Sequence, residues 1–144
     1  MMINKKVFIL IVSFIFSLST LSIAAHLDVS ISNIKNANGK VVLALYNNED
    51  SFPKKGNEYL TASLIITSSN IVHRFESIPS GNYAAVSFHD ENLNKKLDKR
   101  FGKPIESFGF SNGAVPKLGP PKFSAAMFFV TENKTTTINI KLKK

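Results

Sequence analysis

The sequence predicts an all-β protein, a single antiparallel β-sandwich of about seven strands with a long ordered loop between the last strands. Two observations predict it. In residues 27–31 apolar and polar side chains alternate with the two-residue period of a strand that has one wet face. Further short apolar segments are separated by turns rich in Asn, Gly, Pro and Ser, which is typical of sandwiches. A chain of 144 residues has the length of one domain with one core.

The individual strands follow from their apolar patterns. Leu27, Val29 and Ile31 are expected to face the core from the first strand. Residues 41–46 are apolar on both faces, which indicates a central strand covered on both sides. The remaining strands are expected at 63–67, 71–75, 83–88, 124–130 and 136–142, with turns at 36–39, 47–50, 68–70, 78–82 and 132–134.

Residues 89–122 have no sustained period and contain four prolines and four glycines. A connection of this length in a small domain is usually functional or disordered. Its three phenylalanines, Phe101, Phe108 and Phe110, predict an ordered loop that packs its own aromatic side chains. We expect no helix of ordinary length in the chain.

The N-terminus has the layout of a secretory signal peptide over residues 1–24. Lys5 and Lys6 precede an apolar run, and small residues follow it, so cleavage is expected after Ala24 or Ala25. The apolar stretch is shorter than the roughly 20 residues that span a bilayer. The sequence therefore predicts a β-sandwich domain over residues 25–144, which is periplasmic or secreted and does not span a membrane after the signal is removed.

The net charge indicates the class of binding partner, and the absence of cysteine excludes several kinds of chemistry. The chain has 18 basic and 10 acidic residues, and loss of Lys5 and Lys6 with the signal peptide leaves a net charge of +6. Anionic cell-envelope components are the expected partners, or another exported protein, and export argues against nucleic acid. The absence of Cys excludes disulfides, thiolate nucleophiles and Cys-ligated metals.

One segment, the Asp90 loop (residues 90–98), has the spacing of a calcium loop. Oxygen-bearing side chains at its first, third, fifth and ninth positions could surround a hard cation, with a backbone carbonyl at the seventh and a nearby carboxylate as a further partner. The ligands would be Asp90, Asn92, Asn94, Asp98, the Lys96 carbonyl and Glu106. Lys95 stands where such loops usually need Gly, so any calcium affinity should be weak. The alternative is an Asn- and Asp-rich turn whose side chains cap backbone amides.

Two other functions are open from sequence. Five basic residues close to the same loop could bind anionic envelope material: Lys95, Lys96, Lys99, Arg100 and Lys103. A small hydrolase would use His89 with Asp90 or Asp98, but Ser111 lacks the strand and helix context of a nucleophile elbow, and no enzymatic activity is expected. The expected function is a non-enzymatic binding or structural module.

Five blocks in order carry a resemblance to a known family. They are GNYAAVSFHDENLN at 81–94, LD at 97–98, FGKPIE at 101–106, FGFSN at 108–112 and GPPKF at 119–123. Over residues 26–142 the chain resembles the bacterial exported family known as domain of unknown function 2141. The resemblance implies an exported β-sandwich and no established activity, and this chain departs from the family's usual Gly at Lys95 and its frequent Asn at Gly113. Residues 81–88 are also similar to prealbumin-like modules of carboxypeptidases and surface receptors, an analogy of fold that predicts a prealbumin-like or immunoglobulin-like sandwich.

Overall fold

The computed structural model of the chain describes residues 25–144. The predicted signal peptide, residues 1–24, lies outside the described residues. Within the part that is described, no helix has the length and apolar character needed to cross a membrane.

Strands make up most of the regular structure of residues 25–144. In chain order the elements are β1 (Ala25–Ser32), β2 (Lys40–Tyr46), β3 (Leu60–Leu64), β4 (Ile71–Ile78), β5 (Gly81–Asp90), β6 (Lys99–Arg100), β7 (Lys103–Pro104), β8 (Phe108–Phe110), the 3-10 turn η1 (Ser111–Gly113), the helix α1 (Phe123–Ala126), β9 (Phe128–Val130) and β10 (Thr135–Lys141). The helix is a single turn, so the prediction of an all-β protein is confirmed.

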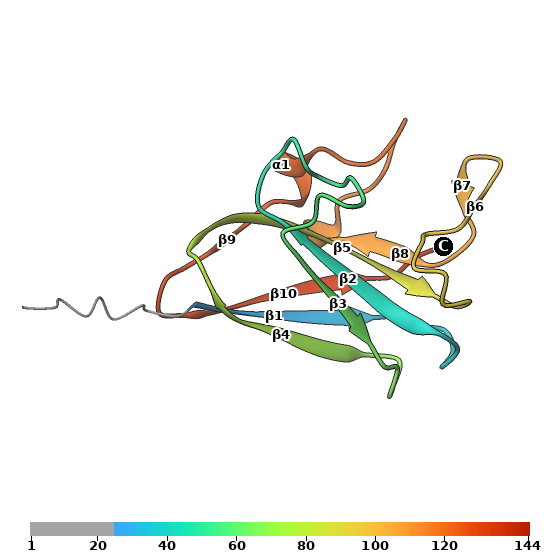
Figure 1. Cartoon of the computed structure of the whole chain (residues 1–144), viewed down its shortest axis with the longest axis horizontal. Helices are drawn as coiled ribbons and strands as arrows, with labels where there is room; N and C mark the ends of the chain where they lie inside the picture. Colours follow the sequence, from blue (N-terminus) through green and yellow to red (C-terminus); the bar gives the residue numbers. More distant parts are fainter. Residues whose placement is uncertain (1–24) are drawn as a thin grey trace, which may run out of the picture.

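Two sheets pack face to face (Figure 1). One has the strand order β10-β1-β4, and the other has the order β3-β2-β5-β8, with β9 pairing to the other end of β5. Phe108 and Lys143 exchange two backbone hydrogen bonds of 2.9 Å, which join β8 to the chain just beyond β10. The predicted sandwich is therefore confirmed, and β6 and β7 form a separate hairpin that projects from it.

One strand pair departs from the antiparallel prediction. β1 and β10 pair in parallel, with Leu27 opposite Thr136 and Ile31 opposite Ile140, while the other strand pairs among residues 25–144 are antiparallel. Strands joined by a tight turn must run antiparallel, but β1 and β10 are the first and last strands and no short connection constrains them.

The space between the sheets holds the main core, and its pattern was predicted by the sequence. Along β1 buried and half-buried residues alternate, and Leu27, Val29 and Ile31 are fully buried as expected. Val41 and Leu43 of β2 face the same core. Each such buried aliphatic side chain stabilises the fold by about 1.5–3 kcal/mol.

The outer face of β2 and β5 is covered by a second, aromatic cluster. Phe52 lies at its centre, with ring centroids 5.3 Å from Tyr46, 6.0 Å from Phe110 and 5.8 Å from Phe123. Edge-to-face pairs at these distances are favourable arrangements of aromatic rings. The prediction that residues 41–46 are covered on both faces is confirmed.

Three local predictions were wrong. Residues 124–130 are not one strand: Phe123 and Ala126 lie three positions apart on one face of α1, and burying both in the aromatic cluster favours a helical turn before β9. The third strand lies at Leu60–Leu64 and not at 63–67. Phe101 does not pack inward with the other loop aromatics, because its side chain is 94% exposed.

Both hydrophobic clusters are formed by residues between Ala25 and Leu142. The described residues thus form a core between the two sheets and a second cluster outside them, and we expect residues 25–144 to fold as a fragment.

Candidate functional site

The Asp90 loop begins where β5 ends. Asp90 is the last residue of β5, lies opposite Lys40 of β2 and is 2% exposed. Its carboxylate accepts backbone hydrogen bonds from Asn94 N at 3.1 Å and Lys95 N at 2.9 Å. The strand therefore fixes a carboxylate that holds the following turn closed.

The other predicted ligands meet around Asp98. Its carboxylate accepts hydrogen bonds from the side-chain amide of Asn92 at 2.6 Å and from that of Asn94 at 2.8 Å. Asn92 Oδ1 accepts a hydrogen bond from Asn94 N at 3.1 Å, and Asn94 Oδ1 accepts one from Lys96 N at 2.9 Å. Four of the six predicted ligand residues, Asp90, Asn92, Asn94 and Asp98, are thus brought together, with their oxygens used by the loop's own donors.

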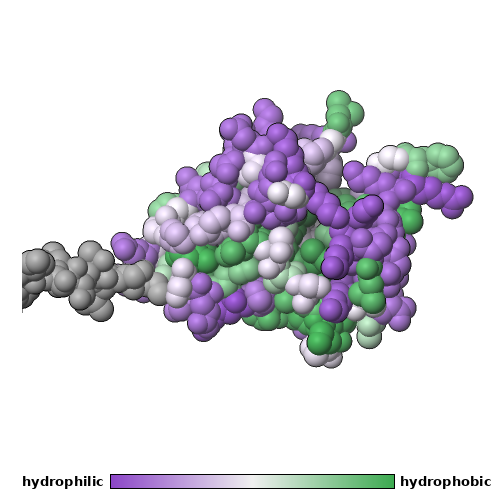
Figure 2. Space-filling model, in the orientation of Figure 1, coloured by the Kyte–Doolittle hydropathy of each residue, from purple (hydrophilic) through white to green (hydrophobic). Residues whose placement is uncertain are grey.

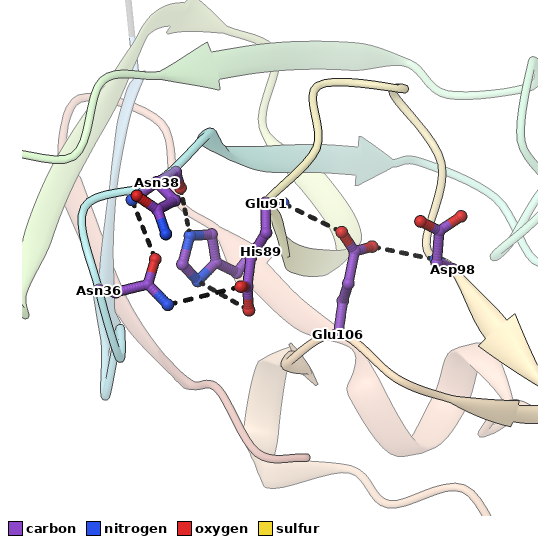
Figure 3. Close-up of polar contacts among 6 residues, drawn as sticks. All are labelled: Asn36, Asn38, His89, Glu91, Asp98 and Glu106. Carbon is purple, nitrogen blue, oxygen red and sulfur yellow. Dashed lines mark hydrogen bonds and ion pairs between the residues drawn. The ribbon is translucent and has the colours of Figure 1, made fainter.

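Glu106 closes the loop from the other side. Its side chain is buried, and its two carboxylate oxygens accept Glu91 N and Asp98 N, both at 3.0 Å (Figure 3). Hydrogen bonds to a charged acceptor are stronger than those between neutral groups. Glu106 therefore ties the start of the Asp90 loop to its end.

Lys95, at the sixth position, adopts the turn that such a loop requires. Its φ is +60°, in the left-handed region that favours glycine. The Lys95 carbonyl accepts a hydrogen bond from the Lys55 ammonium at 2.5 Å. Lys96, whose carbonyl was the predicted ligand at the seventh position, is exposed. Within residues 25–144 no three His, Cys, Asp or Glu side chains come together as a metal-binding group. Side chains of the loop cap its backbone amides, as in the second of the two alternatives from the sequence.

The structure separates the charges of this region. The five basic residues of the cationic segment (residues 95–103) are all exposed, and no ion pair within the described residues involves them. Asp90 and Glu106 are buried and face backbone amides, and Asp98 is half-buried. By contrast, Arg74 on β4 hydrogen-bonds to Asp28 at 2.6 and 2.7 Å and holds the pKa of that carboxyl below its usual value. The surface of the cationic segment is therefore strongly positive.

The cationic segment overlaps the β6–β7 hairpin. Phe101 and Gly102 connect its two strands, with φ of +51° and +77°, the signs found in tight two-residue hairpin turns. The hairpin stands out from the sandwich in Figure 1. At its base, Ile105 N donates to Asp98 O at 2.8 Å, so the Asp90 loop supports the hairpin.

His89, the candidate general base, is fully buried beneath the turn before β2. Its Nε2 lies 2.6 Å from the Asn38 carbonyl, and because a carbonyl only accepts, Nε2 carries the proton and donates (Figure 3). Its Nδ1 lies 4.0 Å from the Glu91 carboxylate and has no hydrogen-bond partner. With no exposed surface, His89 does not meet the first requirement of a general base, which is access to a substrate.

Ser111 has a structural role that the sequence did not indicate. β9 pairs with β5 at residues 81–83 and β8 pairs with it at residues 86–88, which leaves Ala84 and Ala85 between them. The buried Ser111 hydroxyl fills this gap, accepting from Ala85 N at 2.9 Å and donating to Ala126 O at 2.5 Å. It thereby fastens α1 to β5.

Gly39 is the other residue whose importance was missed. A Cβ atom at this position would lie 1.9 Å from the Asp90 carbonyl oxygen and 2.7 Å from Glu91 Cα. The turn at 36–39 was predicted, but its direct contact with the start of the Asp90 loop has no local signal.

Comparison with known proteins places this fold and site in a family. Residues 29–139 match the family described as "Uncharacterized protein conserved in bacteria (DUF2141)". The chain belongs to this family. The matched range includes the Asp90 loop, Glu106 and the β6–β7 hairpin, so the site lies within the family's own domain. Searches of curated proteins and of solved structures found no match to the chain.

Proposed function

We propose that this protein is an exported, non-enzymatic binding module that binds anionic material of the cell envelope through its cationic segment. The observation that carries the proposal is the separation of charge: the five cations of the segment are exposed, whereas two of the four neighbouring acids, Asp90 and Glu106, are buried. A surface with an excess of one charge attracts polyvalent partners of the opposite sign.

The scaffold supports this role. The Asp90 loop is closed by Asp90 and Glu106 through backbone amides and by Asp98 through the side-chain amides of Asn92 and Asn94, so these three carboxylates hold the segment in place. A partner with several phosphate or carboxylate groups could contact several of the exposed ammonium and guanidinium groups at once.

Charge reversal tests the proposal. We expect Lys99→Glu in residues 25–144 to weaken binding of soluble inorganic polyphosphate by about fivefold or more, because one basic residue near an anionic surface contributes about 1 kcal/mol. Titration calorimetry over a series of salt concentrations is the measurement, and binding should weaken steeply as salt rises.

The matched control is Lys134→Glu, which changes the net charge equally but lies in the turn before β10, at the opposite end of the sandwich (Figure 1). It should change the affinity by less than about twofold. Equal losses in the two variants would mean that only net charge matters, and absence of polyphosphate binding at low salt would contradict the proposal.

Calcium binding to the Asp90 loop is a second proposal, favoured by the left-handed turn at Lys95 and by the approach of Asn92 and Asn94 to Asp98. Rotation of the two side-chain amides would turn their oxygens toward Asp98 and allow them to act as ligands. Bound calcium would add positive charge beside the cationic segment.

For this second proposal we expect millimolar calcium to raise the thermal unfolding midpoint of residues 25–144 relative to chelator, since a ligand of the folded state alone stabilises it. Lys95→Gly should enlarge that rise, because it removes a positive charge and suits the φ of +60°. Asp90→Ala should abolish it, and magnesium at the same concentration is the control. Unfolding midpoints that calcium leaves unchanged in both the parent and Lys95→Gly would refute calcium binding.

A further inference from the structure

Two loops of the protein end in hydrophobic side chains that touch little else. Phe101 at the tip of the β6–β7 hairpin is 94% exposed, and Leu118 in the loop between η1 and α1 is fully exposed. Figure 1 shows the hairpin and this second loop, the Leu118 loop (residues 114–122), rising beyond the sandwich at the same upper right of the molecule. In Figure 2 both projections carry hydrophobic colour at their ends.

Basic residues stand beside each hydrophobic tip. Arg100 and Lys103 flank Phe101, and the Arg100 guanidinium lies 5.6 Å from the centre of the Phe101 ring. Lys117 and Lys122 lie on the Leu118 loop and are exposed. An apolar side chain that projects past cations matches the layering of a lipid surface, where acyl chains lie beneath charged head groups.

The tips are held outward by their own backbones. The Phe101–Gly102 turn has positive φ at both residues, and the hydrogen bond from Ile105 N to Asp98 O closes the base of the hairpin. The Leu118 loop contains three prolines, which restrict its φ angles, and Lys117 N donates to Gly119 O at 3.2 Å. The exposure of these side chains therefore belongs to the folded domain, and a partner would not have to unfold either loop to reach them.

We propose that the two tips insert into the interface of an anionic phospholipid bilayer while the neighbouring basic residues bind its head groups. This inference rests on the proposed function and names its partner. A bilayer accepts two separate convex tips without matched pockets, whereas a protein partner would need two pockets at fixed spacing. Each basic residue near such a surface contributes about fivefold to the partition coefficient, and each inserted apolar side chain about tenfold or more.

The absence of tryptophan from the chain allows a site-specific test. Phe101→Trp and Leu118→Trp, each made in residues 25–144, place a single indole at a tip. With vesicles of phosphatidylglycerol and phosphatidylcholine we expect a blue shift of its emission and quenching by lipids brominated in the acyl chains. Val72→Trp is the control, because Val72 is 67% exposed on β4, away from both loops, and its emission should not change.

Vesicle sedimentation measures how much the two hydrophobic tips contribute to membrane affinity. Phe101→Ser with Leu118→Ser should weaken binding to phosphatidylglycerol vesicles by at least about tenfold and leave polyphosphate binding unchanged, whereas Val72→Ser should change neither by more than about twofold. Pure phosphatidylcholine vesicles should bind weakly, because they carry no net charge.

The outcomes separate the two proposals. Polyphosphate binding without vesicle binding, or vesicle binding that the two serine substitutions leave intact, would overturn the insertion of the tips while the proposed function stands. If the unsubstituted fragment binds neither polyphosphate nor the vesicles, the proposed function and this inference are both overturned.

Discussion

Replacing Gly39 by alanine is expected to destabilise the domain by about 3–5 kcal/mol. The added Cβ would lie 1.9 Å from the Asp90 carbonyl oxygen and 2.7 Å from Glu91 Cα, so the turn or the end of β5 must move. The backbone of Gly39 also has a φ of +68°, which adds the smaller strain of a left-handed residue. Denaturant unfolding of residues 25–144 measures the loss.

The matched control is Gly113→Ala. Gly113 has a similar φ of +60°, but a Cβ there would meet no atom within 4 Å. It should cost about 1 kcal/mol, the strain alone. If the two substitutions destabilise the domain equally, the close approach of the 36–39 turn to Asp90 is not what requires glycine at position 39.

Removal of the Glu106 carboxylate has the second large expected effect. Glu106→Ala should lower the free energy of unfolding by about 2–4 kcal/mol, because Glu91 N and Asp98 N lose a charged acceptor. Hydrogen exchange should show that both amides lose protection. Glu106→Gln keeps one acceptor oxygen, so it should preserve protection at one amide and destabilise the domain less.

Glu91→Ala separates this effect from simple loss of a nearby negative charge. The Glu91 side chain is 39% exposed and makes only long contacts, 3.5 Å to the Asn36 amide and 4.0 Å to His89, so its loss should cost less than about 0.5 kcal/mol. A Glu106→Ala variant as stable as Glu91→Ala would show that the Asp90 loop does not depend on the buried carboxylate.

The substitutions at Gly39 and Glu106 both test how the Asp90 loop is held at the end of β5. Gly39 allows the turn before β2 to approach the end of β5, and Glu106 fastens the loop that follows. The base of the β6–β7 hairpin hydrogen-bonds to Asp98, so loosening the loop should also loosen the hairpin. We therefore expect Glu106→Ala to weaken polyphosphate binding although Glu106 itself is buried.

The pattern of apolar and polar residues along the chain correctly predicted β1 and β2. The alternation in β1 and the two apolar faces of β2 were visible in consecutive residues, because side chains of a strand point alternately to its two faces. The same logic failed at residues 124–130, where an apolar run suits a strand or a short buried helix equally. Contact of Phe123 with Phe52, far away in sequence, favoured the helix.

The candidate site was located by sequence but not explained by it. Asp90, Asn92, Asn94 and Asp98 were identified from their spacing, and they do come together. Glu106 was expected as an outer ligand, and the structure shows in addition that its carboxylate accepts two backbone amides, which the sequence did not indicate. The role of Gly39 had no signal, because it depends on a residue 51 positions away in the chain.

By itself the sequence determined the all-β class, the approximate strands, the family and the position of the Asp90 loop. The first two follow from the pattern of adjacent residues, the loop from the spacing of its side chains, and the family from sequence blocks that occur in a fixed order. Only the tertiary structure decided how the charges of this region are distributed. In sequence, five bases and four acids nearly cancel. Folding turns Asp90 and Glu106 inward, where backbone amides satisfy them, and leaves the bases and Phe101 in solvent. The direction of a loop side chain is set by long-range hydrogen bonds and burial, which have no period along the chain.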